Sequence, residues 1–337
     1  MKSFRRAAAV ALFFVPLVAG CASYASPAAR SSPTAGTAEA NGITLAYERH
    51  GPADRETILL IGGTGMQLID WPEALIQELV DRGYHVVTFD NRDTGLSTHL
   101  DSAGPPDWAA LQRAGEQGLP PPLPYTLEDM AADAVGLLDA LGIERAHVVG
   151  ASMGGIIAQL MAIHHPEKLL SLTSMMAGSG NPTLPLPAKP EVLASVGTPP
   201  VGGTVEERIA YEVRARKALG SPAHPTDESV IRERVERDFR RADDPVGLAR
   251  QQAASLVASF QDRRETLRQV QLPTVVIHGA EDPLVPVQGG REVAESIANA
   301  EFRVIPGMGH DLPDAFVPTI ADGIVAAASR ASVSRTD

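Results

Sequence analysis

The sequence contains almost no cysteine and has a deficit of positive charge. Cys21 is the only cysteine among 337 residues, so no disulfide can form within the chain and the fold must rest on its hydrophobic core. The 29 lysine and arginine residues are outnumbered by 41 acidic residues, which gives a formal net charge of −12. So acidic a chain is poorly suited to phosphate backbones or anionic membrane surfaces. We therefore expect no nucleic-acid partner.

Sequence motifs for metals and nucleotides are also missing. No H-E-x-x-H sequence or cluster of metal-ligating residues is present, which removes the common zinc patterns. The glycine-rich run Gly62-Gly63-Thr64-Gly65 is not followed by lysine, and no G-x-G-x-x-G opens a helix, so a phosphate-binding loop is not indicated. We expect neither a metal nor an organic cofactor.

The N-terminal 20 residues have the pattern of a secretory signal peptide. A basic segment, Met1–Arg6, is followed by the apolar segment Ala7–Val18, as is typical of such signals. The apolar run is shorter than the roughly 20 residues that a membrane-spanning helix needs. We therefore expect residues 1–20 to direct export and not to belong to the fold.

The segment Val18-Ala19-Gly20-Cys21 resembles the lipobox of bacterial lipoproteins. That resemblance implies that Cys21 is acylated and becomes the first residue of an exported, periplasmic or cell-surface lipoprotein, held to a membrane through the lipid anchor only. The alternative is an ordinary signal peptide cleaved nearby, with Cys21 incidental. Residues 21–38 are rich in alanine, serine and proline and have almost no charge, which indicates a flexible tether.

Beyond the tether, apolar strand patterns alternate with helical ones. This alternation predicts an α/β fold, a mostly parallel, doubly wound sheet covered by helices on both faces. The spacing predicts helices over 71–81, 127–141 and 154–164. It predicts strands over 43–48, 57–61, 85–89, 146–149, 170–176, 274–278 and 302–305.

Two stretches interrupt this alternation. Residues 98–124 contain Pro105-Pro106 and Pro120-Pro121-Pro122 and are predicted to be a long loop. Residues 179–270 begin with a proline-rich passage and continue with charged helical patterns but no strand pattern. We interpret them as a helical cap inserted into a core made of residues 39–178 and 271–330.

The segment Gly150-Ala151-Ser152-Met153-Gly154 matches the pattern G-x-S-x-G. A predicted strand precedes it and a predicted helix follows it, which is the setting of a nucleophile elbow. There the serine sits on a strained turn, and the glycines leave room for the backbone. The alternative is a glycine-rich turn with a structural serine. The context favours Ser152 as a nucleophile.

A serine nucleophile needs a base, and the base needs an acid to orient it. In a fold with this elbow the chain order is serine, acid, histidine. Asp282 follows a predicted strand and precedes Pro283, and we prefer it to its neighbour Glu281. His310 follows the last predicted strand and is our candidate base, whereas His278 lies at a strand end and is expected to be structural.

The oxyanion of an acyl-transfer reaction needs two hydrogen-bond donors. The backbone N–H of Met153, directly after the candidate nucleophile, is one expected donor. The loop at Gly62-Gly63 follows an early predicted strand, and its glycines allow the backbone to approach a substrate. We expect the second donor to be the N–H of Thr64.

Together these segments resemble the α/β-hydrolase superfamily over most of residues 39–325. Within it, Asn91-Arg92-Asp93-Thr94-Gly95 and Gly150–Gly154 are similar to the branch that contains aclacinomycin methylesterase. The chain has Gly62-Gly63 where the superfamily usually has His-Gly, and Asp93 where it usually has glycine. The resemblance implies Ser152, Asp282 and His310 as a triad and hydrolysis of carboxylic esters on bulky polyketides.

The sequence thus predicts a serine carboxylic-ester hydrolase that acts on a small-molecule ester without a cofactor. Two alternatives stay open. One is a carbon–carbon bond or peptide hydrolase that uses the same triad. The other is a non-catalytic ligand-binding protein of the same fold. The substrate and the oligomeric state are not indicated by the sequence.

Overall fold

The computed structural model describes residues 33–184, 190–197 and 202–333. Its centre is an eight-stranded sheet in the order β1-β2-β4-β3-β5-β6-β7-β8. The first two strands run antiparallel to their neighbours, and the remaining pairs are parallel. This confirms the predicted fold class. The strands are Thr34–Ala40 (β1), Ile43–His50 (β2), Thr57–Ile61 (β3), His85–Phe89 (β4), Ala146–Ala151 (β5), Leu169–Met175 (β6), Thr274–Gly279 (β7) and Glu301–Ile305 (β8).

The sheet begins inside the stretch that the sequence assigned to the tether. Asn41 and Gly42 both have positive φ angles, 50° and 78°, as a two-residue hairpin turn requires. The turn folds β1 back onto β2, so that Ala40 pairs with Ile43. Residues 34–38 therefore belong to β1 and not to the predicted tether. The predicted signal peptide and Cys21 lie outside the described residues.

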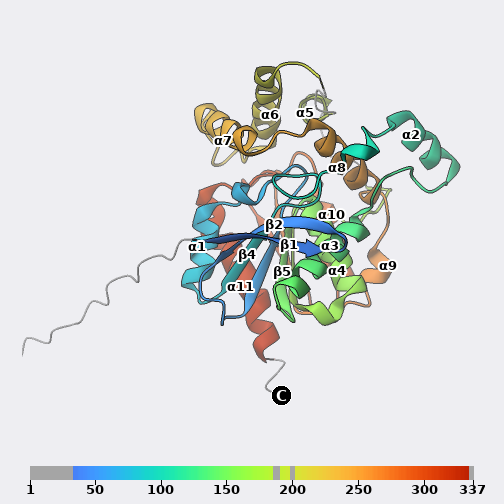
Figure 1. Ribbon diagram of the computed structural model, residues 1–337. Coiled ribbons are helices and arrows are strands. Elements are labelled where there is room, and N and C mark those ends of the chain that lie inside the picture. The colour runs from blue at the N-terminus through green and yellow to red at the C-terminus, as the bar shows by residue number, and fades with distance from the viewer. Residues whose placement is uncertain (1–32, 185–189, 198–201, 334–337) are drawn as a thin grey trace, which may run out of the picture. The chain divides into compact units, whose positions relative to one another are not determined.

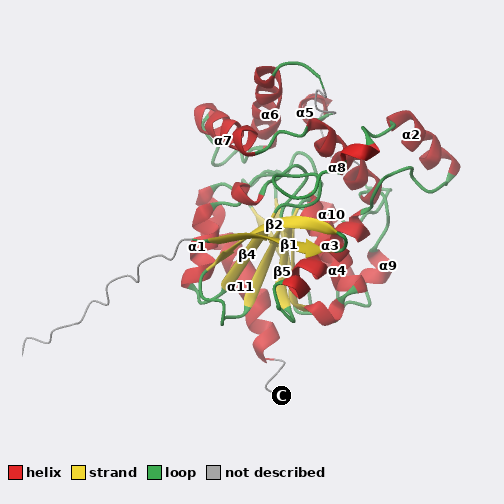
Figure 2. Cartoon of the chain, in the orientation of Figure 1, coloured by secondary structure: helices red, strands yellow, loops and turns green. Residues whose placement is uncertain are grey.

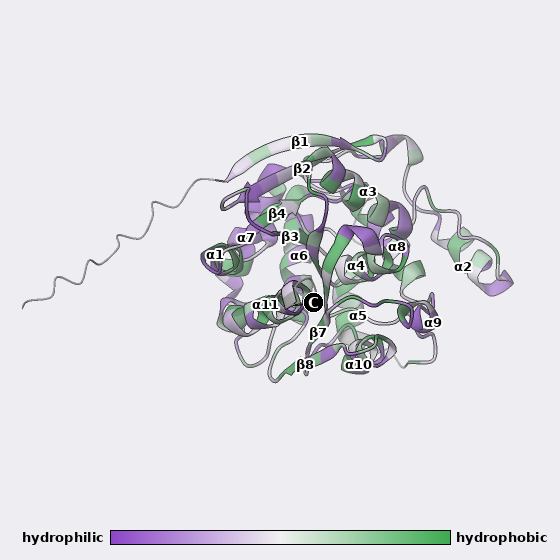
Figure 3. Ribbon diagram, turned by 90° about the horizontal axis from the view of Figure 1, so that it is seen from below, coloured by the Kyte–Doolittle hydropathy of each residue, from purple (hydrophilic) through white to green (hydrophobic). Residues whose placement is uncertain are grey.

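Helices cover both faces of the sheet (Figure 2). One face packs against α1 (Glu73–Asp81) and α11 (Val317–Val333), and the other against α3 (Leu127–Ala140), α4 (Met153–His164) and α10 (Val287–Ser296). Strand β3 shows the alternation: Ile58 and Leu60 face the first layer, while Leu59 and Ile61 face the second. Strands buried on both sides need continuous apolar runs, and this explains the sequence pattern. Apolar residues are concentrated in these central elements (Figure 3).

A helical segment is inserted between β6 and β7. Figure 1 shows α5, α6 and α7 beyond one end of the sheet, with α8 closer to the core. Helices α6 and α7 form a small core of their own from Ile209, Val213, Ile231 and Val235. We call α5 to α8 the cap. The inserted helices are Pro190–Val196 (α5), Val205–Leu219 (α6), Glu228–Arg241 (α7), Pro245–Ala258 (α8) and the short Arg264–Leu267 (α9).

The prediction of a continuous loop over residues 98–124 is wrong in its middle part. Residues Trp108–Gln117 form helix α2, which lies to one side of the sheet in Figure 1. The Asp107 carboxylate accepts a hydrogen bond from the N–H of Ala110 and caps the helix, and Gly118 ends it with a φ of 65°. The proline clusters on both sides indicated a loop, but the helix between them is short and is stabilised by a residue that caps each end. In the described part of the chain, no helix has the length and hydrophobicity to cross a membrane.

Candidate active site

Ser152 occupies a strained turn between β5 and α4. Its φ and ψ angles are 56° and −120°, a region that residues with a side chain rarely adopt. The turn is possible because of the glycines on either side. A Cβ atom on Gly150 would lie 1.9 Å from the carbonyl oxygen of Gly154, and one on Gly154 would lie 2.0 Å from that of Ile61. The backbone thus projects the hydroxyl of Ser152 into a cavity above the sheet.

The hydroxyl of Ser152 lies at one end of a hydrogen-bonded chain of three side chains. Its Oγ is 2.9 Å from Nε2 of His310, and Nδ1 of His310 is 2.7 Å from Oδ2 of Asp282. Asp282 follows β7 and His310 follows β8, so both come from the carboxyl ends of parallel strands. Glu281, the alternative acid, instead accepts a hydrogen bond from the N–H of Gly307.

The carboxylate of Asp282 is held by contacts other than the one with His310. Its Oδ1 accepts hydrogen bonds from the N–H groups of Leu284 and Val285, at 2.9 and 2.8 Å. Its Oδ2 lies 3.3 Å from Nε2 of His278, which also lies 3.1 Å from the carbonyl oxygen of Val285. Both His278 and Asp282 have fully buried side chains. His278 therefore supports the acid and does not contact Ser152.

Burial and charge shift the pKa values of Asp282 and His310 in opposite directions. Burial raises the pKa of Asp282, but the charge of His310 and hydrogen bonds from His278 and His310 outweigh it and hold that pKa well below its usual range. Burial lowers the pKa of His310, but the charge and hydrogen bond of Asp282, aided by Asp311, raise it above 6.5. The carboxylate therefore stabilises an imidazolium at this position, as a general base requires once it has taken a proton.

The two expected oxyanion donors belong to residues that line the same cavity as Ser152. Thr64 and Met153 both line the cavity, and among the described residues neither backbone N–H donates to a protein acceptor. Met153 begins α4, so its N–H has no partner within the helix. The loop that carries Thr64 comes close to the serine, because a Cβ atom on Gly63 would lie 3.2 Å from that of Ser152.

The turn after β4 ties the cap to the core. Asp90 is fully buried and accepts hydrogen bonds from the N–H of Leu68, at 2.7 Å, and from Arg241 of α7, also at 2.7 Å. Asp93 forms a pair of 2.7 Å hydrogen bonds with Arg250 of α8, and neither side chain is exposed. These buried charges position the cap helices over the sheet.

A cavity of about 850 Å³ lies between the cap and the carboxyl ends of the strands, within the size range of small-molecule sites. Sequence patterns could not indicate which cap residues line it, because they meet only in the folded chain. Around the serine and along α8 the lining is largely apolar: Met176, Leu248, Leu256, Phe260, Leu284 and Val285. From α6, α7 and the turn after α7, the lining combines Tyr211, Ala215, Leu219 and Phe239 with charged residues: Arg208, Glu212, Arg216, Arg234, Asp238 and Asp243.

Two carboxyl groups meet where α7 reaches the core. Asp70 and Asp238 share the guanidinium groups of Arg216 and Arg237, with Asp70 Oδ1 3.1 Å from Arg237 and Asp238 Oδ2 2.7 Å from Arg216. Burial raises the pKa of Asp70 to about 7, and Asp238 adds to the rise while Arg216 opposes it. The carboxyl group of Asp70, where the core meets the cap, therefore binds a proton at higher pH than an exposed aspartate does.

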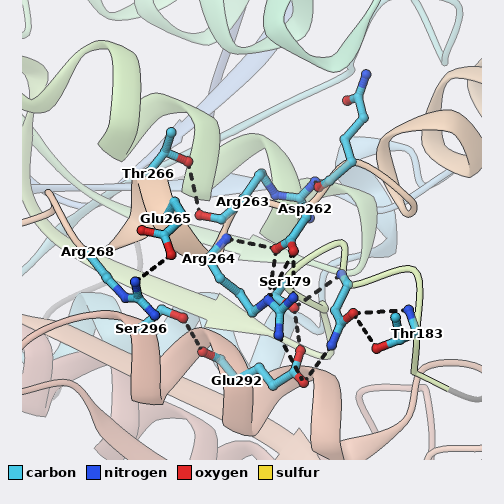
Figure 4. Close-up of polar contacts among 12 residues, drawn as sticks. Ser179, Thr183, Asp262, Arg263, Arg264, Glu265, Thr266, Arg268, Glu292 and Ser296 are labelled. Carbon is cyan, nitrogen blue, oxygen red and sulfur yellow. Dashed lines mark hydrogen bonds and ion pairs between the residues drawn. The ribbon is translucent and has the colours of Figure 1, made fainter. Parts of the chain in front are cut away.

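The loop after β6 is held by a polar network (Figure 4). The carboxylate of Glu292 on α10 accepts hydrogen bonds from the hydroxyl of Ser179, at 2.7 Å, and from the amide of Asn181, at 2.9 Å. Arg263 donates to the carbonyl oxygens of Gly178 and Ala258. Since Ser179 and Asn181 line the cavity, this network fixes the wall on that side.

One group of side chains in the described residues has the composition of a metal site: Asp93, His99 and Asp244. Its members are already engaged with protein groups. Nδ1 of His99 lies 2.6 Å from Asp244 and its Nε2 lies 3.1 Å from the carbonyl oxygen of Gly95. The hydrogen bond that His99 donates to Asp244 raises the pKa of His99 to about 9. A protonated histidine beside the Arg250 guanidinium repels a cation, so these residues do not fit a metal.

Comparisons with known proteins agree with the fold. A family model described as the alpha/beta hydrolase fold matches residues 56–314. The chain is 30% identical to rhodomycin D methylesterase DnrP of Streptomyces peucetius, over 86% of this chain and 97% of that protein. It is 29% identical to DauP of Streptomyces sp. (strain C5), of the same name and with the same coverage. A solved hydrolase from Pseudomonas aeruginosa PA01 superposes with a TM-score of 0.62 at 26% identity, over 87% and 97% of the two chains.

Proposed function

Because this chain belongs to the α/β-hydrolase family, in the branch of the methylesterases, we propose that it is a serine carboxylic-ester hydrolase that acts through an acyl-enzyme. The observation that carries the proposal is the continuous hydrogen-bonded chain from Ser152 through His310 to Asp282. It lies at the floor of a cavity large enough for a small-molecule ester. A binding protein of the same fold has no need of this chain of groups.

The first step is attack of the Ser152 hydroxyl on the ester carbonyl. Nε2 of His310 takes the hydroxyl proton as the O–C bond forms, and Asp282 stabilises the resulting imidazolium. The N–H groups of Thr64 and Met153 donate to the oxyanion of the tetrahedral intermediate. His310 then gives its proton to the leaving alcohol, and the acyl group remains on Ser152.

The second step repeats the same proton movements with water. His310 takes a proton from the water molecule that attacks the acyl carbonyl, and it then gives this proton to Oγ of Ser152 as the tetrahedral intermediate collapses. The carboxylic acid leaves and the enzyme is restored. Neither step requires a metal or an organic cofactor.

The cavity supports a bulky ester or lactone as substrate. Its lining near Ser152 is largely apolar, and α6 and α7 contribute charged as well as apolar residues, so the lining matches a substrate with an apolar body and polar substituents that face α6 and α7. The names of DnrP and DauP describe methyl-ester cleavage on rhodomycin D. This favours an ester over an amide or a carbon–carbon bond for this chain.

A panel of substrates with a matched inactive variant tests the proposal. Purified protein should react with a fluorophosphonate probe and should hydrolyse p-nitrophenyl esters and bulky methyl esters. Ser152→Ala should abolish both. Ser174→Ala is the control, because the buried hydroxyl of Ser174 contacts Gln159 and not His310. Labelling that persists in Ser152→Ala refutes the nucleophile. Faster cleavage of amides or of vinylogous diketones than of esters refutes ester hydrolysis.

We further propose that the enzyme is exported and carried on a lipid attached to Cys21. The support is the basic and apolar segments before the lipobox-like tetrapeptide. Cells grown with labelled palmitate should incorporate it into the protein, and Cys21→Ala should prevent this. Incorporation that continues in Cys21→Ala refutes the anchor, without bearing on the hydrolase activity.

A further inference from the structure

The loop that carries His310 is bound to the end of cap helix α6. The N–H of His310 donates to the carbonyl oxygen of Leu219, at 2.8 Å, and the N–H of Ala223 donates to that of Gly307, at 3.2 Å. The N–H of Gly309 donates to the hydroxyl of Ser221, at 2.9 Å. We call residues 219–223 the return segment and residues 307–311 the histidine loop.

Ser221 has contacts on both sides of the histidine. Its hydroxyl accepts from Gly309 and donates to the carboxylate of Asp311, so it joins the residues before and after His310. Ser221 is fully buried. The two segments are in close contact, since a Cβ atom on Gly309 would lie 2.6 Å from the carbonyl oxygen of Leu219. A buried hydroxyl with both a donor and an acceptor satisfied holds its partners in one geometry.

Asp311 is a second carboxylate beside the imidazole. Its charge raises the pKa of His310, after the larger contribution of Asp282. Burial raises the pKa of Asp311 itself, while hydrogen bonds from Ser221 oppose the rise. The titratable and charged side chains that lie around His310 or line the same cavity from α6 are Asp282, His278, Asp311, Arg208, Glu212 and Arg216.

The return segment continues directly from the cavity wall. Tyr211, Ala215 and Leu219 of α6 line the cavity, and Leu219 also holds the backbone of His310. A substrate that presses on α6 therefore acts on the same element that orients the base.

Given the proposed function, we propose that Ser221 and Asp311 are positioning residues that hold His310 in its reactive orientation through the return segment of the cap. The cap then contributes to the rate of the chemical steps as well as to the shape of the cavity. Neither residue takes or gives a proton in the reaction.

Substitutions of Ser221 separate the hydroxyl from the bulk of the side chain. Ser221→Thr and Ser221→Val add similar volume, but only threonine keeps the hydroxyl. We expect kcat of Ser221→Val to be about tenfold to a hundredfold below that of Ser221→Thr, since small errors in position have effects of this size. KM should change little, because the hydroxyl does not face the cavity. Equal kcat values in the two variants overturn the role of Ser221. Ser229→Ala, on the exposed face of α7, is the control.

Asp311→Asn tests the charge while an acceptor for Ser221 is kept. Loss of the carboxylate should lower the pKa of His310, so the acid limb of kcat/KM should move to lower pH by about half a unit or more. A purely structural side chain would leave that limb in place. NMR titration of labelled histidine, with the His310 signal identified by its absence in His310→Gln, measures the same shift without substrate. An unchanged pKa overturns the role of Asp311.

The two proposals fail in different ways. If the native protein neither reacts with the fluorophosphonate nor cleaves esters, the proposed function is wrong. The NMR titration still decides whether Asp311 acts on His310. If the native protein is an active esterase and the titration and kcat comparisons show no difference, only the positioning role is wrong.

Discussion

Replacement of Asp282 by asparagine should disable the base with little change in shape. Oδ1 of Asp282 accepts two backbone hydrogen bonds, so the asparagine carbonyl will take that place and its NH₂ group will face Nδ1 of His310. The imidazole must then accept at Nδ1 and carry its proton on Nε2. That proton faces Ser152, and the ring can no longer remove a proton from the hydroxyl. In the variant, Nε2 of His278 will also face this NH₂ group, whereas in the native protein it lies 3.3 Å from the carboxylate.

The size of the effect follows from the loss of the correct tautomer. The same change in another Ser-His-Asp enzyme lowers kcat by about 10⁴, which is about 5.5 kcal/mol of transition-state stabilisation. Here the short 2.7 Å contact and the full burial of Asp282 place the acid in an equivalent position. We therefore expect kcat for a p-nitrophenyl ester to fall by about 10³ to 10⁴, with KM changed little.

Steady-state kinetics of Asp282→Asn beside Glu281→Gln makes this test specific. Glu281 is the adjacent carboxylate, and its contact with the N–H of Gly307 can be kept by glutamine. We expect Glu281→Gln to retain kcat within about threefold. Circular dichroism and thermal melting should show that both variants are folded. The reasoning is refuted if Asp282→Asn keeps kcat within about tenfold of the native value, or if Glu281→Gln loses more.

Three further outcomes are expected. Gly63→Ala should lower kcat by about ten- to a hundredfold, because the new methyl group would lie 3.2 Å from Cβ of Ser152 and displace the oxyanion loop; unchanged turnover would contradict the close approach. Arg250→Met leaves the buried Asp93 carboxylate without its partner. The free energy of unfolding, measured by urea titration, should therefore fall by about 3–5 kcal/mol. A loss below about 1 kcal/mol would contradict a stabilising role of the ion pair. In the folded state the pKa of Asp70 is about 7, above its usual 3.8. Between these two pH values Asp70 is protonated in the folded state but ionised in the unfolded state, so the folded state loses stability as the pH rises from about 4 to about 7. The Tm of Asp70→Asn relative to native should therefore be more favourable at about pH 8 than at about pH 5, and a pH-independent difference would contradict the raised pKa of Asp70.

Local sequence patterns predicted most of the strands and helices of the fold. The strands at residues 57–61 and 85–89 coincide with those of the structure, because buried parallel strands need continuous apolar runs that are visible in the sequence. Helix α2 was missed, since its caps are a single aspartate, Asp107, and a single glycine, Gly118, which lie between proline clusters. Strand β1 was missed because it is stabilised by pairing with β2, and the composition of its own residues does not indicate a strand.

By itself the sequence determined the order serine, acid, histidine and the turn on which Ser152 stands, because the glycines around it and the strand before it are local features. The sequence favoured Asp282 over Glu281, and the tertiary structure shows the contact of Asp282 with His310, because that contact depends on how the loops after β7 and β8 pack together. Only the tertiary structure decided that His278 supports the acid, and that Ser221 of the cap holds the loop of His310. Contacts between residues about 90 positions apart have no periodicity in the chain, and they arise only when the cap folds onto the sheet.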